Sequence, residues 1–179
     1  TKFPVLTNLH ASRGRLAAAM NAAPEETQRA YLRAMEKPIL PKVVPTGPVK
    51  EVVLTGDTVN LYDLPQMVHH EGDAGPYLTA AISFAKDPTA EVWNCAYNRL
   101  MIKGRDTTSI HLTTGKHLWE FHRIAESRGE PLPVALVIGV HPAIALGALA
   151  IGSIDEDERG IMGALLGEPL ELVKCETSD

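Results

Sequence analysis

The sequence predicts an α+β fold in which antiparallel β-hairpins are combined with inserted helices. Three strand-like runs follow one another after Pro76: "YLTAAISFAK", "VWNCAYNRLMIK" and "TTSIHLT". The connections between them, "DPTAE" and "GRD", are of hairpin length. The elements after residue 116 do not show the regular βαβ alternation of a doubly wound sheet. These observations favour antiparallel sheets.

The N-terminal part predicts two helices and a connector. Ser12 can cap a helix through Ala22, and Pro24 suits the first turn of a second helix that ends near Lys37. The stretch 37–50 holds four prolines and is therefore expected to be extended. A strand, a turn and a short strand are expected in "EVVLTGDTVNLYDLPQ".

The later elements follow in order along the chain. A glycine-rich polar loop, 69–77, precedes the three strands, and a helix with apolar residues at helical spacing is expected from Lys116 to Arg128. An apolar strand, "LPVALVIGV", and two helices rich in small residues come next. The last element, "PLELVKCE", is expected to be a strand in the interior of a sheet.

Composition excludes several classes of protein. The apolar content of 45% and the charged content of 22% are those of a globular domain, and the net charge of −5 argues against nucleic-acid binding. No apolar run is long enough to span a membrane. Cys95 and Cys175 lie in apolar runs without a CxxC pair, so two buried thiols in the reducing cytoplasm are expected.

One arginine within a predicted strand requires an explanation. Arg99 lies among apolar neighbours in the run Trp93 to Gly104. A buried guanidinium without a partner costs several kcal/mol, so an anion is expected beside it. Strand alternation puts Asn94 and Arg99 on opposite faces, and both can meet one ligand only if the strand bends between them.

The residues offer few other sites. The sequence contains neither GxGxxG nor the P-loop motif, and no HExxH. His69, His70, Glu71 and Asp73 are best interpreted as a solvated loop, because adjacent histidines on a strand point to opposite faces. A set of polar residues scattered along the sequence remains: Asn94, Arg99, Lys116, His117 and Glu176. An amide, an imidazole and a carboxylate from this set suit a divalent cation such as magnesium or manganese, and the imidazole favours manganese.

Four segments in order resemble the UbiD family of decarboxylases, which use prenylated FMN. They are "AGPYLTAAISFAKDP", "NCAYNRLMIKGRDTTSIHLTTGKH", "GEPLPVALVIGVHPAIAL" and "GEPLELVKCETSD". The N-terminal stretch "PVLTNLHASRGRLAAAM" is similar to the family's N-terminal region. The most specific motifs are Asn-x4-Arg, the histidine eighteen residues after Arg99, and the closing "LVKCE".

The resemblance implies a cofactor site on an antiparallel split β-barrel of the flavin-binding type. It implies a partial N-terminal α/β segment at 1–68 and a prenylated-FMN-binding domain at 69–179, incomplete at its C-terminus. Asn94, His117 and Glu176 resemble the ligands of a divalent metal, usually manganese, with a potassium ion beside the flavin phosphate. Arg99 resembles the catalytic arginine. The resemblance also covers the family's cofactor-binding residues. They correspond to Asn94, Cys95, Ala96, Tyr97, Asn98, Arg99, Lys116, His117 and Glu176.

The implied activity is reversible non-oxidative decarboxylation of an aromatic or α,β-unsaturated carboxylic acid. Family members are much longer than 179 residues, and the glutamate that donates a proton lies downstream in them. We therefore expect a fragment or one chain of a split enzyme, not competent alone. It would need its missing C-terminal half or a second polypeptide, and it is expected to form a homo-oligomer. Two alternatives stay open: a non-catalytic flavin-binding or scaffolding subunit, and an unrelated split-barrel flavin reductase, in which the metal set would be idle.

Overall fold

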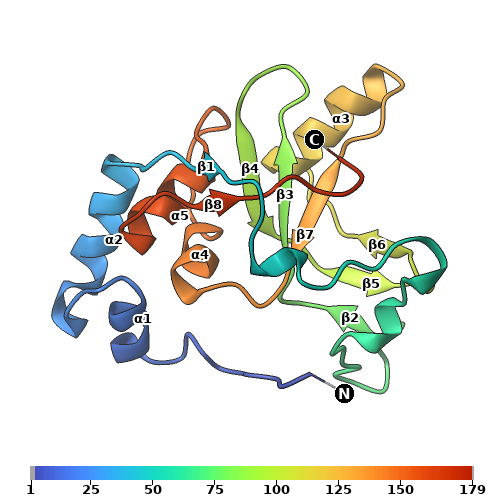
Figure 1. The fold of residues 1–179 in the computed structure, drawn as a ribbon, viewed down its shortest axis with the longest axis horizontal. Coiled ribbons are helices and arrows are strands. Elements are labelled where there is room, and N and C mark those ends of the chain that lie inside the picture. Colours follow the sequence, from blue (N-terminus) through green and yellow to red (C-terminus); the bar gives the residue numbers. More distant parts are fainter. Residues whose placement is uncertain (1–2, 179) are drawn as a thin grey trace.

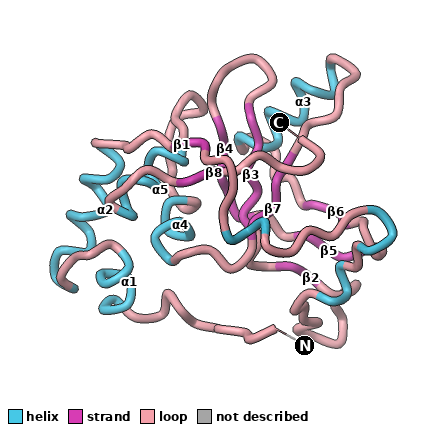
Figure 2. Tube along the Cα trace, in the orientation of Figure 1, coloured by secondary structure: helices cyan, strands magenta, loops and turns pink. Residues whose placement is uncertain are grey.

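The computed structural model describes residues 3–178, in which helices and short strands are mixed (Figure 1). The α-helices are α1 (Arg13–Ala19), α2 (Thr27–Glu36), α3 (His117–Ser127), α4 (Pro142–Gly147) and α5 (Glu158–Leu166). The strands are β1 (Lys42–Val43), β2 (Tyr77–Leu78), β3 (Ile82–Lys86), β4 (Trp93–Tyr97), β5 (Leu100–Ile102), β6 (Thr108–Ile110), β7 (Val134–Val137) and β8 (Glu171–Leu172). Short 3-10 turns lie at Pro24–Glu26, Pro48–Lys50, Gly56–Thr58 and Leu61–Asp63. Much of the remaining chain is loop (Figure 2).

The strands of the described residues form three small sheets. Two are antiparallel, with the orders β4-β3-β7 and β2-β5-β6, and the third is the parallel pair β1-β8. The prediction of a mixed α and β fold with antiparallel hairpins is confirmed. Within residues 3–178 the sheets do not close into a barrel. No helix in this range is long and apolar enough to cross a membrane.

The predicted strand from Trp93 to Gly104 is in fact two strands in different sheets. β4 pairs with β3, whereas β5 pairs with β2 and β6. Asn98 and Arg99 form the corner between them. The buried hydroxyl of Ser83, on β3, is hydrogen-bonded to the carbonyl of Ala96 and to the Asn98 side chain, so the corner is anchored to the sheet. The bend that a ligand shared by Asn94 and Arg99 would require is therefore present.

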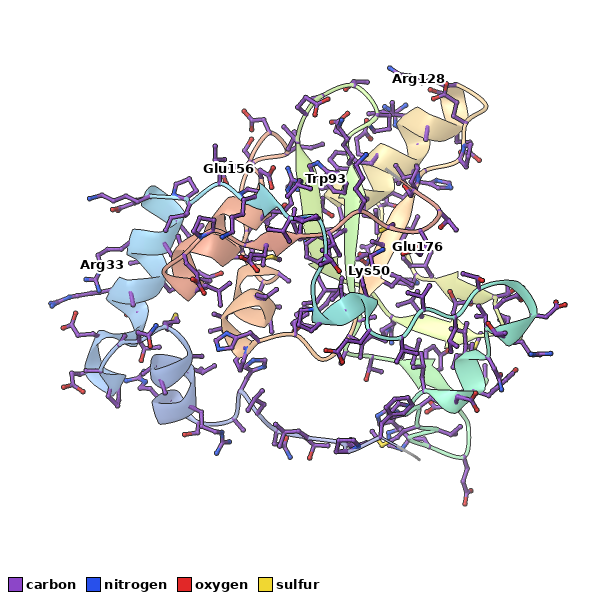
Figure 3. All side chains as sticks on the ribbon, in the orientation of Figure 1. Arg33, Lys50, Trp93, Arg128, Glu156 and Glu176 are labelled. Atoms are coloured by element: carbon purple, nitrogen blue, oxygen red, sulfur yellow. The ribbon has the colours of Figure 1, made fainter. Side chains whose placement is uncertain are left out.

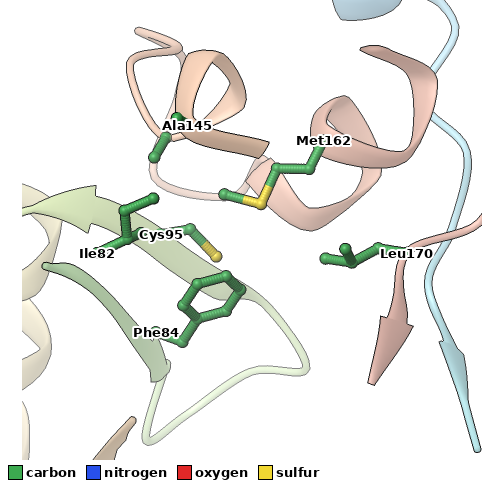
Figure 4. Close-up of a cluster of buried hydrophobic side chains, with 7 residues drawn as sticks. Ile82, Phe84, Cys95, Ala145, Met162 and Leu170 are labelled. Atoms are coloured by element: carbon green, nitrogen blue, oxygen red, sulfur yellow. The ribbon is translucent and has the colours of Figure 1, made fainter. Parts of the chain in front are cut away.

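The sheet β4-β3-β7 lies between helices because successive residues of β3 point to opposite faces. On one face Ile82 and Phe84 pack with Cys95 and with Met162 of α5 (Figure 4). On the other face Ala85 packs with Leu118 and Phe121 of α3. α5 and α3 are thus held on opposite faces of one sheet.

Small residues let the helices approach closely. A Cβ atom on Gly147 of α4 would lie 2.5 Å from Met162 Cγ, and one on Gly163 of α5 would lie 2.5 Å from the carbonyl oxygen of Ile39. Alanine would fit at neither position without movement of a neighbour. Gly147 is therefore a close-packing glycine, and Gly139, with φ 78°, occupies a turn.

The N-terminal and later parts are joined in the structure. α1 and α2 agree with the predicted helices, α2 packs on α5 through Ala34 and Ile161, and β1 pairs with β8. The predicted division between residues 68 and 69 stays a prediction.

Two features of the C-terminal region differ from prediction. The run "PLELVKCE" was expected to be an interior strand, but β8 has only two residues and pairs only with β1 among the described residues. Cys95 is buried as expected, whereas Cys175 is exposed, because it lies beyond the paired residues.

The two edges of the sheet β4-β3-β7 are unlike. Within residues 3–178, β7 pairs only with β3, and its side chains at Val134 and Leu136 are 39% and 42% exposed. Ile138, just after the strand, is 47% exposed. An open apolar edge therefore runs along β7.

Candidate functional site

A buried carboxylate occupies the other edge of that sheet, along β4. Glu158 is the first residue of α5 and is 4% exposed. Its Oε1 accepts a hydrogen bond from Asn94 Nδ2 at 3.1 Å, and its Oε2 accepts one from the backbone N–H of Cys95 at 3.2 Å. An edge strand leaves alternate N–H groups unpaired, and here a side chain takes the place of a neighbouring strand.

An imidazole approaches the same carboxylate from the opposite face of the sheet. His117 is the first residue of α3, and its Nδ1 lies 3.7 Å from Glu158 Oε1. His117 is the only basic side chain in ion-pair contact with Glu158 within the described range 3–178. The N-termini of α3 and α5 carry partial positive charge and meet at this point. The site is therefore built from one strand edge and two helix starts.

Burial changes the acid–base properties of the site. It raises the pKa of Glu158 from 4.5 to about 7, although the hydrogen bonds from Asn94 and Cys95 act in the other direction. Burial also raises the pKa of the Cys95 thiol well above 9.0, and the charge of Glu158 adds to this effect. Cys95 is thus a packed core residue that offers its backbone, whereas Glu158 is a carboxylate short of positive charge.

The structure brings two of the three predicted metal ligands to the Glu158 carboxylate and places the third elsewhere. Asn94 and His117 both contact Glu158. Glu176 instead pairs with Lys50, at 2.5 Å between Nζ and Oε1, and its side chain is 51% exposed (Figure 3). The reason is that the chain after β8 runs over the surface and does not continue as an interior strand.

Glu158 was missed because the stretch 155–167 was interpreted only as a helix rich in small residues. A signal was present in the helical spacing. Glu158 shares one face of α5 with Ile161, Met162 and Leu165, all of them buried. An acid at the first position of such an apolar face is directed toward the core.

Arg99 also differs from expectation, since it is exposed and not buried. Its backbone oxygen accepts from His111 N at 3.2 Å, but among residues 3–178 its guanidinium has no hydrogen-bond or ion-pair partner. The corner turns this side chain toward solvent, so no buried anion is required. Lys116 is exposed at the N-cap of α3. Tyr97 is partly buried, and burial raises its pKa.

The donor set fits a divalent cation. Asn94, His117 and Glu158 offer an amide, an imidazole and a carboxylate, and the amide carries an oxygen as well as the nitrogen that now faces Glu158. Manganese accepts both oxygen and imidazole ligands. Among the described residues no group of three or more His, Cys, Asp and Glu side chains could hold a metal ion, so this candidate set includes the Asn94 amide.

Comparison with known proteins decides the family. Residues 42–179 match the family model of the UbiD 3-octaprenyl-4-hydroxybenzoate carboxy-lyase Rift-related domain. The chain belongs to the UbiD family. A curated relative, anhydromevalonate phosphate decarboxylase of Methanothermobacter thermautotrophicus, is 33% identical over 99% of this chain and 41% of its own length.

Solved UbiD-class structures show the same fold. An evolved dimeric form of HmfF from Pelotomaculum thermopropionicum, in complex with prFMN, is 44% identical with a TM-score of 0.88, over 94% of this chain and 40% of that one. The closed form of Sedimentibacter hydroxybenzoicus vanillic acid decarboxylase is 28% identical with a TM-score of 0.90, over 99% and 40%. This chain therefore spans about two fifths of the length of these UbiD proteins.

Proposed function

We propose that this chain is the cofactor-binding portion of a UbiD decarboxylase and that Asn94, His117 and Glu158 hold the divalent metal of its flavin site. One observation carries the proposal: the buried Glu158 carboxylate lies between an amide and an imidazole and lacks a Lys or Arg partner among the described residues. A divalent cation would supply the missing positive charge, and the N-termini of α3 and α5 would favour a phosphate beside it.

The flavin is proposed from relatives that bind it. Structures of HmfF, 44% and 45% identical to this chain, contain prFMN and FMN. Prenylated FMN, when bound, supplies the electron sink that lets a carboxylate leave as CO2. The protein's part is to bind and orient. Manganese at the proposed ligands would fix the phosphate, and potassium beside it is proposed from the family resemblance alone. The cofactor would contact residues 94–99 together with Lys116 and His117.

Arg99 is proposed as the catalytic residue that binds the substrate carboxylate. Its guanidinium is exposed and unpaired within residues 3–178, and it stands at the corner between two sheets. A forked donor with no internal partner is available to a carboxylate. The substrate would be an aromatic or α,β-unsaturated acid, and relatives act on vanillic acid and on anhydromevalonate phosphate.

Further parts of the proposal concern the rest of the protein. The sheets β4-β3-β7 and β2-β5-β6 would form part of a flavin-binding split barrel, with the N-terminal segment ending near residue 68. Because the chain spans about two fifths of its relatives, the activity belongs to a complete protein or to a complex with a second polypeptide. This chain alone is expected to be inactive, and a homo-oligomer is expected for the complete protein.

The test is manganese binding by matched glutamate variants. Glu158→Gln should weaken binding by about tenfold or more, whereas Glu176→Gln should leave the dissociation constant unchanged. Equal binding by wild type and Glu158→Gln would overturn the ligand assignment. Two further measurements separate an enzyme from a flavin-binding scaffold. Both would show prenylated-FMN absorbance after reconstitution of the chain. Only the enzyme would release CO2 after the remaining polypeptide is added.

A further inference from the structure

Three side chains adjoin the proposed metal ligands and contact one another. Trp93 directly precedes Asn94 on β4, and Asp157 and Arg159 flank Glu158 at the start of α5. The Arg159 guanidinium carbon lies 4.5 Å from the centroid of the Trp93 ring. Arg159 Nε and Nη2 donate to the Asp157 carboxylate at 2.9 and 2.6 Å. We refer to Trp93, Asp157 and Arg159 as the clasp.

The clasp is partly buried and its charges are satisfied internally. The side chains of Arg159 and Asp157 are only 14% and 20% exposed. A forked guanidinium–carboxylate pair stacked on an aromatic face holds all three groups in one geometry. Asp157 also caps α5, since its Oδ1 accepts from the backbone N–H of Arg159 at 3.0 Å. The clasp therefore joins the first turn of α5 to the beginning of β4.

The joined segments are those that carry two metal ligands. Asn94 and Glu158 are 64 residues apart in sequence, and their side chains meet at 3.1 Å. A metal site requires its donors to be held within about 0.5 Å of the productive geometry. We propose that the clasp is a positioning device, which sets the spacing of Asn94 and Glu158 and thereby the affinity for the divalent metal. This inference rests on the proposed function.

The clasp has a second, electrostatic effect. Arg159 is the residue next to Glu158, yet it pairs with Asp157 and not with Glu158. The pairing keeps a cation from neutralising the carboxylate that the metal needs. Asp157→Asn would keep the capping oxygen but remove the partner charge, because asparagine caps helices as well as aspartate does. Arg159 would then be free to turn to Glu158 and compete with the metal.

The experiment is a manganese titration of the flavin-free chain, followed by the electron paramagnetic resonance signal of free and bound Mn²⁺. Each variant is measured at a temperature where circular dichroism shows it folded. Trp93→Leu, Arg159→Met and Asp157→Asn should each weaken binding by about tenfold, the range found for groups that orient metal ligands, and should broaden the spectrum of the bound ion. Trp93→Phe should restore near wild-type affinity because it keeps an aromatic face.

Arg128→Met is the matched control. Arg128 donates to the carbonyl of Pro88 and is exposed on another element, so its loss should leave manganese affinity unchanged. Wild-type affinity in folded Trp93→Leu and Arg159→Met would overturn the clasp and leave the metal site intact. No manganese binding by wild type would overturn the proposed function, and the clasp with it. If Arg159→Met does not fold, Asp157→Asn and the Trp93 pair decide the question.

Discussion

Replacing Glu158 with glutamine should change how the stability of the metal-free protein depends on pH. Burial raises the pKa of this carboxyl from 4.5 to about 7. Between these values the folded protein keeps a proton that the unfolded chain releases. The free energy of unfolding therefore falls as the pH rises through this window, and the full loss is reached above about pH 7.

The magnitude follows from the size of the shift. The difference between about 7 and 4.5 is about 2.5 pKa units, and at about 1.36 kcal/mol per unit the full loss is about 3 to 3.5 kcal/mol. Glutamine cannot ionise, so Glu158→Gln should lack this part of the pH dependence. It should also lose one of the two oxygens that accept from Asn94 Nδ2 and from the Cys95 N–H, a cost of about 1 kcal/mol at every pH.

The assay is denaturant unfolding in the presence of a chelator, from about pH 4 to about pH 8, a range that brackets the pKa values of 4.5 and about 7. The slope of unfolding free energy against pH is compared between wild type and variant, because the lost hydrogen bond shifts the whole curve equally. Glu156→Gln, an exposed neighbour, is the control and should follow the wild-type slope. Identical slopes for wild type and Glu158→Gln would refute the reasoning.

Three further outcomes are expected. Arg99→Lys should change the unfolding free energy by less than about 0.5 kcal/mol because the side chain is exposed. It should nevertheless lower turnover of the complete enzyme on the order of 100-fold, whereas the control Arg105→Lys should not. Full turnover by Arg99→Lys would reject the catalytic role. Phe121→Ala should cost about 3–5 kcal/mol in denaturant unfolding, since this ring is fully buried under α3, and a loss below that range would show that the face is not packed as described. Gly163→Ala should cost about 1–3 kcal/mol, because the new Cβ would lie 2.5 Å from a backbone oxygen of Ile39; an unchanged melting temperature would contradict that approach.

The sequence predicted the fold class because its signals were local. Hairpin-length connections gave the antiparallel strands, and the apolar spacing of 118–125 gave α3. The change of sheet at Asn98 and Arg99 could not be predicted from the local sequence, because it depends on which distant strands β4 and β5 pair with. The same limit explains Arg99, whose exposure is set by the corner and not by its apolar neighbours in sequence.

The candidate site was predicted in part for a similar reason. Asn94 and His117 were identified through the resemblance to the UbiD family, and the structure brings them to one carboxylate. Glu158 lies 64 residues from Asn94, so only tertiary packing around the β4 edge reveals the pair. Glu176 ends an apolar run and was therefore expected to enter the core, but only two residues of that run are paired as β8.

The two edges of the sheet β4-β3-β7 differ in whether a further strand can pair with them. At the β4 edge, the Glu158 carboxylate occupies a backbone N–H that a new strand would need. At the β7 edge, backbone groups and the apolar side chains of Val134 and Leu136 stay accessible within the described chain. An incoming strand, from whatever polypeptide, can therefore extend this sheet only from the side away from the buried carboxylate. The open apolar edge and the proposed metal site thus lie on opposite borders of the same three strands.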